Sequence, residues 1–146
     1  MERQAMDPER FVERLPQLCI GARMRGFPQG LDDLDVFLQS VASEIPREPV
    51  LSERWVNAAI LRWLEDVGLH VEIDHVNIRR RLVDYGYLSR TRDGKRYALT
   101  DKVVDVPDSR AVIARALEER AARRAAAEAE GRTGSRSASG TTPGGA

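Results

Sequence analysis

The feature that most constrains this chain is the stretch at residues 72–99, with the sequence EIDHVNIRRRLVDYGYLSRTRDGKRYAL. Asp74 is a favourable N-cap residue, because its carboxylate accepts hydrogen bonds from the free N–H groups of a first helical turn. Gly86 stands where a residue in the left-handed conformation would end that helix. The stretch therefore predicts a helix over residues 74–85 whose two ends are both specified locally.

A β-hairpin is predicted directly after this helix. Asp93 and Gly94 stand between two strand-like runs, and this dipeptide is the strongest short-range signal for a hairpin. A two-residue turn there predicts cross-strand pairs on one face: Arg92 with Lys95, Arg90 with Tyr97, and Leu88 with Leu99. We expect the side chain of Arg90 to lie over the ring of Tyr97. The tip of the hairpin then carries a cluster of cations: Arg92, Lys95 and Arg96.

A rotation of about 100° per residue divides the predicted helix into two faces. The inward face is apolar and is centred on Leu82, with Val76, Ile78, Val83 and Tyr85 around it. Arg79 falls on the inward side, where a charge must be paired or must reach solvent. We expect Arg79 to make a structural ion pair or hydrogen bonds, with contact to a ligand as the alternative. The outward face carries polar residues: Asn77, Arg80, Arg81 and Asp84.

Between residues 79 and 96 the chain carries seven basic and two acidic residues, although its formal net charge is zero. A local excess of this kind favours an anion-binding surface, with a merely solvated basic face as the alternative. We favour binding, because a helix and a hairpin are the elements that face DNA in a winged helix. The expected nucleic-acid contacts are Asn77, Arg80, Arg81, Arg90, Arg92, Lys95 and Arg96. The residues expected to be structural are Asp74, Arg79, Leu82, Asp84, Gly86, Gly94 and Tyr97.

Two helices are predicted before this stretch. Apolar residues at helical spacing predict the first over residues 31–45. The second begins after Ser52, a good N-cap residue, and its apolar face is expected to bury both Trp55 and Trp63 in the core. A short strand at residues 50–51 is expected to pair with the hairpin. Helix, helix, turn, helix and hairpin is the element order of a winged helix.

We therefore predict a mainly α fold with a small β-hairpin, namely a winged helix-turn-helix core with an added N-terminal helix and a C-terminal helix. Residues 1–30 form the N-terminal helical extension, which packs on the domain or contacts a partner, and Pro16 is expected to bend or break its helix. Residues 31–106 form the winged-helix-like domain, and residues 107–130 form the C-terminal helix. Residues 131–146, with the sequence GRTGSRSASGTTPGGA, have the composition of a disordered tail.

The string DHVNIRRRLVDYGYLSRTRDGKRY resembles the signature of an uncharacterised bacterial family, domain of unknown function 2087. The matching positions are Asp74, His75, Arg79, Arg80, Leu82, Val83, Asp84, Gly86, Leu88, Arg90, Asp93, Gly94 and Tyr97. The resemblance covers about residues 27–98. It departs at Arg81, where an acidic residue is usual, and at residues 50–51, where an aromatic residue often precedes the serine. Because family members occur alone or attached to transcriptional regulators, the resemblance implies a regulatory, winged-helix-like role.

Other kinds of chemistry have little support in the sequence. It contains no Gly-rich phosphate loop, no zinc-type cysteine spacing and no nucleophile elbow, so we expect no enzymatic activity, cofactor, metal site or small-molecule ligand. Its single cysteine, Cys19, lies on an apolar stripe and is expected to be buried and inert. No apolar run approaches the length of a membrane span, and a cytoplasmic location is expected.

Two functions from different classes are compatible with these sequence features. In the first, the chain is a DNA-binding transcriptional regulator with its recognition helix at residues 74–85 and a basic wing at residues 88–99. In the second, the same basic surface is a non-enzymatic module that binds an acidic protein or a second copy of the chain. Asp84 on the outward face favours the second function, although a carboxylate also accepts a hydrogen bond from cytosine.

Overall fold

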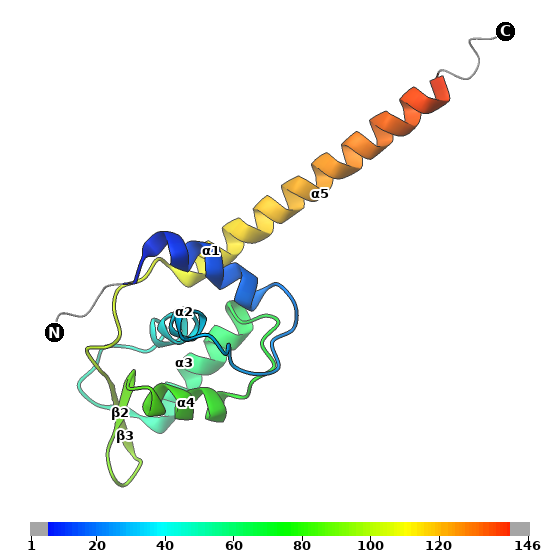
Figure 1. Ribbon diagram of the computed structural model, residues 1–146. Coiled ribbons are helices and arrows are strands. Elements are labelled where there is room, and N and C mark those ends of the chain that lie inside the picture. Colours follow the sequence, from blue (N-terminus) through cyan, green and yellow to red (C-terminus); the bar gives the residue numbers. More distant parts are fainter. Residues whose placement is uncertain (1–5, 141–146) are drawn as a thin grey trace. The chain divides into compact units, whose positions relative to one another are not determined.

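The structure, a computed structural model, describes residues 6–140, with side chains through residue 132. Over these residues the chain is mainly helical, with a small three-stranded antiparallel sheet (Figure 1). In chain order the elements are α1 (Pro8–Cys19), α2 (Leu31–Ala42), β1 (Leu51–Ser52), α3 (Glu53–Asp66), α4 (His75–Asp84), β2 (Leu88–Arg90), β3 (Arg96–Leu99) and α5 (Ser109–Gly140). Residues 6–113 form one compact unit, and residues 114–140 belong to a second.

Trp63 of α3 lies fully buried in the core of the first unit. Its ring meets Phe37 of α2 edge-on, with 5.1 Å between the ring centroids. Its indole N–H donates to Ser40 Oγ at 2.8 Å, and that oxygen lies 2.7 Å from Ser109 Oγ. A buried indole N–H needs such an acceptor, because it has lost its hydrogen bond to water. This network joins α2 and α3 to the first residue of α5.

The N-terminal segment is part of the same core. α1 begins as predicted, because Asp7 caps the helix and Pro8 occupies its first turn. The sequence predicted that Pro16 bends or breaks this helix, but the helix continues through Pro16 without a break. Only three residues of the helix follow this proline, so few backbone hydrogen bonds lie beyond the one that is lost with its missing N–H. α1 packs against α2 through a buried face that includes Phe11 and Leu15.

The sheet has the strand order β1-β3-β2. In the β2–β3 hairpin, Leu88 pairs with Leu99 and Arg90 with Tyr97, which confirms the predicted register. The short strand expected before α3 also pairs with β3, although it lies one residue later than predicted, at Leu51–Ser52. Ser52 then caps α3 by accepting a hydrogen bond from the Trp55 N–H at 3.2 Å.

The turn of the hairpin differs from the prediction. A two-residue turn at this dipeptide requires a positive φ at Asp93, but in the described part of the chain only glycines have one, among them Gly94 with φ of 72°. The Gly94 N–H instead donates to the Thr91 carbonyl at 2.9 Å. The loop therefore contains four residues, Arg92 to Lys95, and the strand pair predicted between these two ends is wrong.

Two large side chains that were expected on inward faces are exposed: Trp55 of α3, and Tyr85 at the end of α4, which is 38 % exposed. The buried face of α3 includes Val56, Ile60 and Trp63. Trp55 is 60 % exposed, because it lies about 100° around the helix from its neighbour Val56. The prediction for this tryptophan is therefore wrong.

The second unit consists of α5 from residue 114 onward. The helix passes the end predicted at residue 130 and continues through Gly140, so residues 131–140 are helical rather than disordered. Extending a helix needs no new nucleus, because each further residue adds a hydrogen bond to an existing turn. The rest of the predicted tail, residues 141–146, lies outside the described residues. Neither α5 nor any other helix in the described part is long and apolar enough to cross a membrane.

Candidate nucleic-acid interface

The two ends of α4 are held by local hydrogen bonds. At the start, the Asp74 carboxylate accepts from the Asn77 backbone N–H at 2.9 Å, which confirms the predicted N-cap. At the end, Gly86 has a φ of 82°, as the left-handed position requires. The Tyr87 N–H donates to the Leu82 carbonyl at 2.8 Å and the Gly86 N–H to the Val83 carbonyl at 3.1 Å, the bonds of a Schellman motif. β2 therefore begins at a defined angle to the helix.

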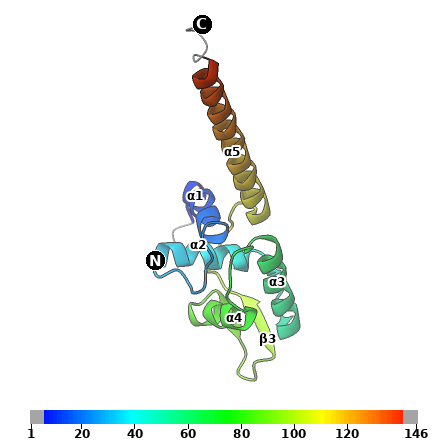
Figure 2. The ribbon, with the colours of Figure 1, turned by 90° about the vertical axis from the view of Figure 1, so that its right-hand side faces the viewer.

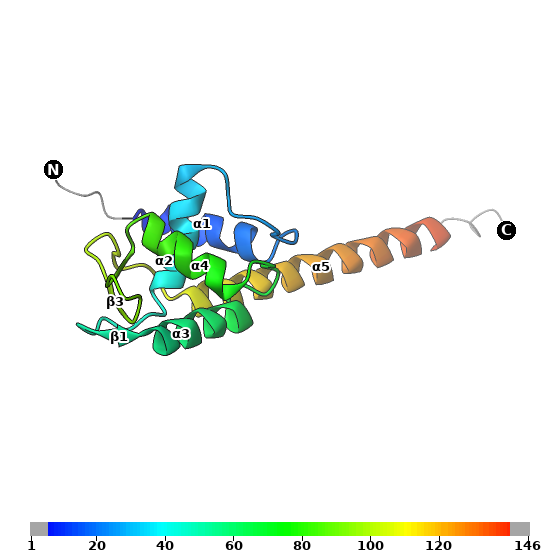
Figure 3. The same cartoon turned by 90° about the horizontal axis from the view of Figure 1, so that it is seen from below.

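Figures 2 and 3 show α4 beside α3, with the hairpin next to both helices. The inward face of α4 buries Ile78 and Leu82 completely, as the helical spacing predicted. This packing determines which side chains of α4 face outward and which face its neighbours.

Arg79 links α4 to α3 and to the sheet. Its side chain is only 12 % exposed, and its Nη2 lies 3.1 Å from a carboxylate oxygen of Glu53. Its Nη1 donates to Asn57 Oδ1, and its guanidinium lies 6.0 Å from the centroid of the Tyr97 ring. The Tyr97 hydroxyl donates to the same carboxylate of Glu53 at 3.2 Å. The expected structural pairing of Arg79 is confirmed. The contact of Arg79 with the Tyr97 ring was not predicted from the sequence.

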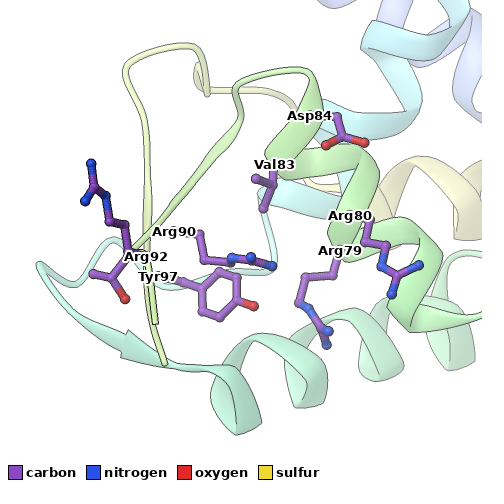
Figure 4. A pocket seen from close by; sticks show the side chains of 8 residues that line it. Arg79, Arg80, Val83, Asp84, Arg90, Arg92 and Tyr97 are labelled. Carbon is purple, nitrogen blue, oxygen red and sulfur yellow. The ribbon is translucent and has the colours of Figure 1, made fainter. Parts of the chain in front are cut away.

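A groove of about 280 Å³ lies between α4 and the hairpin (Figure 4). Its lining comprises Arg79, Arg80, Val83, Asp84, Arg90, Thr91, Arg92 and Tyr97. In the close view, Arg90 reaches from β2 toward α4 and lies next to the Tyr97 ring, while Arg92 extends away on the hairpin side. The groove thus brings together four arginines from two elements and a single carboxylate.

The arginines of the groove differ in whether they have a counter-ion. Arg79 is paired with Glu53. Arg80, Arg90 and Arg92 are exposed, and none makes an ion pair or a side-chain hydrogen bond within the described residues. Arg80 and Asp84 stand one turn apart on α4, but no ion pair joins them. Three guanidinium groups therefore face solvent without an ion-pair partner in the described part of the chain.

Two other residues predicted on the outward face have local partners. The guanidinium of Arg81 lies over the Phe27 ring, 4.0 Å from its centroid, and is half-buried. The Asn77 side-chain amide donates to the second carboxylate oxygen of Asp74 at 3.0 Å. The expected outward position is therefore confirmed for Arg80 and wrong for Arg81, whose charge lies against the loop before α2.

The hairpin tip is organised by Asp93. Its carboxylate accepts from the Thr91 hydroxyl at 2.6 Å and from the Lys95 N–H at 3.0 Å. These hydrogen bonds, the hydroxyl bond first, lower the pKa of Asp93. The side chains of Arg92, Lys95 and Arg96 all remain exposed around this turn. The predicted cluster of cations at the tip is thus present on a loop with a defined conformation.

Sequence reasoning missed Glu53 and Phe27. Glu53 was one of many charged residues, and its position in the first turn of α3 indicated only a favourable interaction with the helix dipole. The pairing with Arg79 arises because α3 and α4 pack together, which brings two residues that are distant in the chain into contact.

Outside the groove, Cys19 is buried and Arg110 is paired with carboxylates. Burial raises the pKa of the Cys19 thiol to about 12, so the thiol stays protonated at neutral pH. Arg110 lies between Glu44 and Asp66, and its hydrogen bonds to these carboxylates raise the pKa of its guanidinium. Within the part of the chain that is described, no three His, Cys, Asp or Glu residues converge as metal ligands would.

These features define a small, mainly helical protein with a three-stranded antiparallel sheet and a basic groove between its fourth helix and its hairpin. Residues 23–99, from the loop before α2 to the end of β3, match the model of a family described as an uncharacterized protein conserved in bacteria (DUF2087). The chain belongs to this family, as the resemblance over residues 27–98 had implied. No curated protein and no solved structure matches the chain.

Proposed function

We propose that this chain is a winged helix-turn-helix protein that binds duplex DNA and regulates transcription. In this proposal α2, α3 and α4 form the three-helix core, α4 enters the major groove and the β2–β3 hairpin is the wing. The order of the elements supports the winged-helix class. The strand β1 also supports it, because it lies between α2 and α3 in the chain and pairs with β3 of the hairpin.

The observation that carries the proposal is the set of unpaired cations beside α4. Arg80, Arg90 and Arg92 line one groove without a counter-ion among the described residues, and Lys95 and Arg96 extend the basic surface to the tip. Cations of this kind gain binding free energy at a phosphate backbone, because each contact releases condensed counter-ions. A chain with zero net charge has no general attraction to DNA, so binding must depend on this local surface.

The test is a fluorescence-anisotropy titration with random-sequence duplex DNA at several salt concentrations. Affinity should fall with salt at a log–log slope of roughly −0.9 for each phosphate neutralised. The Arg92→Ala and Lys95→Ala variants should each flatten this slope by about one unit and should weaken binding to all sequences alike.

Arg62→Ala is the matched control for lost positive charge. Arg62 is exposed on α3, and it lies five residues after Asn57, roughly 140° around the helix from the side that contacts α4. Its removal should leave the slope unchanged. If wild-type protein shows no salt-dependent binding at micromolar concentration, the proposal fails.

A second candidate, an interaction module for an acidic protein, is favoured by Asp84. This carboxylate is exposed on the rim of the groove and has no ion-pair partner among the described residues, so it would repel a neighbouring phosphate. Asp84→Asn separates the two functions. It should strengthen binding to duplex DNA under the first proposal, whereas an acidic protein that pairs its own cations with Asp84 should bind the variant more weakly.

A further inference from the structure

We propose that the groove between α4 and the hairpin is a seat for a single phosphate group, held by Arg80 and Arg90. This inference rests on the proposed function only in its expectation that the phosphate normally belongs to a nucleic-acid backbone. The seat itself follows from the geometry and charge of the groove.

The two arginines line the groove from different elements. Arg90 comes from β2 and extends toward α4 beside the Tyr97 ring, whereas the Arg80 guanidinium points from α4 away from the hairpin (Figure 4). Because Arg80 is exposed and has no partner among the described residues, its side chain is free to turn toward a ligand in the groove. A phosphate is tetrahedral and offers several oxygens, so it accepts hydrogen bonds from guanidinium groups that arrive from different sides. A carboxylate offers two oxygens in one plane and is satisfied by one arginine in a parallel fork.

The remaining lining explains why the arginines stay available. The Glu53 carboxylate is paired with the Arg79 guanidinium, so it does not neutralise Arg80 or Arg90. Asp84 lines the far end of the groove and forms no ion pair with either arginine within the described residues. A Cβ at Gly94 would lie 3.8 Å from Arg90 Nε, so the turn of the hairpin closes one side of the Arg90 side chain.

The size of the groove indicates a small ligand group. The groove has a volume of about 280 Å³. It exceeds the needs of a phosphate alone, and Val83 and Tyr97 give it an apolar part. The space therefore suits a phosphate together with the sugar to which it is attached.

The experiment is a set of ¹H–¹⁵N NMR titrations of the full chain at constant ionic strength, with inorganic phosphate, a deoxynucleoside 5′-monophosphate, acetate and duplex DNA as separate ligands. We expect saturable shifts with phosphate at the arginine Nε–H signals of Arg80 and Arg90. The nucleoside monophosphate should bind more tightly than inorganic phosphate, and acetate should cause no saturable shift. Arg80→Ala and Arg90→Ala should each reduce phosphate affinity at least several-fold, whereas Arg62→Ala should not.

The outcomes distinguish this seat from the proposed function. Phosphate binding at Arg80 and Arg90 without binding of duplex DNA supports the seat, assigns it to a free phosphorylated molecule and refutes DNA binding. Binding of duplex DNA with no saturable phosphate shift, and no effect of Arg90→Ala, overturns the seat and leaves DNA binding intact. Equal shifts with acetate also overturn it, because the groove would then be a carboxylate site of the kind an acidic protein occupies.

Discussion

Replacement of Glu53 should weaken the fold and strengthen DNA binding at the same time. The carboxylate of Glu53 forms an ion pair with Arg79 and accepts a hydrogen bond from the Tyr97 hydroxyl, so it connects α3 to α4 and to β3. In Glu53→Ala the guanidinium of Arg79, which is 12 % exposed, loses its counter-ion. In Glu53→Gln an acceptor oxygen remains while the negative charge is removed.

The expected stability loss lies between two limits. A hydrogen bond to a charged group contributes about 1.5–3 kcal/mol when buried, whereas an exposed ion pair contributes about 0.2–1 kcal/mol. Because the Glu53 side chain is 48 % exposed, we expect Glu53→Ala to cost about 1–2 kcal/mol. For a unit of this size the loss corresponds to a Tm lower by about 5–10 °C. Glu53→Gln should lose less, because it keeps an acceptor.

The effect on DNA binding has the opposite sign. Without the carboxylate, the charge of Arg79 adds to that of the groove, so the salt dependence should steepen by up to about one unit. The assays are thermal denaturation followed by circular dichroism, and the anisotropy titration with random duplex DNA. Glu65→Ala and Glu65→Gln are the controls, because Glu65 is exposed on the same helix without a partner among the described residues. Their Tm should stay within the effect of about 0.5 kcal/mol typical of surface sites.

Two results would refute this reasoning. If Glu53→Ala melts at the same temperature as Glu65→Ala, the contact between Arg79 and Glu53 does not hold α4 in place. If Glu53→Gln binds duplex DNA no more tightly than Glu65→Gln, the charge of the groove does not govern binding.

Three further predictions concern the core. Leu82→Ala should cost about 2–5 kcal/mol in urea denaturation, because the side chain is fully buried at the centre of the inward face of α4; a wild-type midpoint would contradict the packing described for α4. Gly68→Ala should destabilise by about 1–3 kcal/mol, because a Cβ there would lie 2.5 Å from the buried Trp63 ring, and a neutral effect would mean that the ring moves freely. Cys19 should resist iodoacetamide in the native protein at pH 8, since burial raises its thiol pKa to about 12. Because the raised pKa favours the folded state only while the thiol is protonated, this contribution should be complete below the ordinary pKa of 9.0 and lost as pH rises toward 12.

The features that the sequence by itself determined are those set by neighbouring residues. Asp7, Ser52 and Asp74 cap their helices, because an N-cap bond reaches only two or three residues along the chain. Gly86 ends α4 for a similarly local reason. The hairpin register was also predictable, because a short loop between two strands leaves few ways to align them.

Helical spacing was a weaker guide, because it identifies a face without saying how wide the buried part is. It correctly placed Leu82 and Trp63 in the core. It also placed Trp55 there, although the neighbours of α3 cover a narrower strip that ends before this residue. The conformation of the hairpin turn was missed for another reason, since two loops with the same register differ only in the φ angle that Asp93 adopts.

Only the tertiary structure decided which of the arginines are free. The three consecutive arginines of α4 have the same chemistry, yet Arg79 is paired with Glu53, Arg81 lies over Phe27 and Arg80 has no partner in the described residues. The two partners come from segments far from α4 in the sequence. Charge pairing depends on distance in space and on desolvation, neither of which the order of residues along the chain contains.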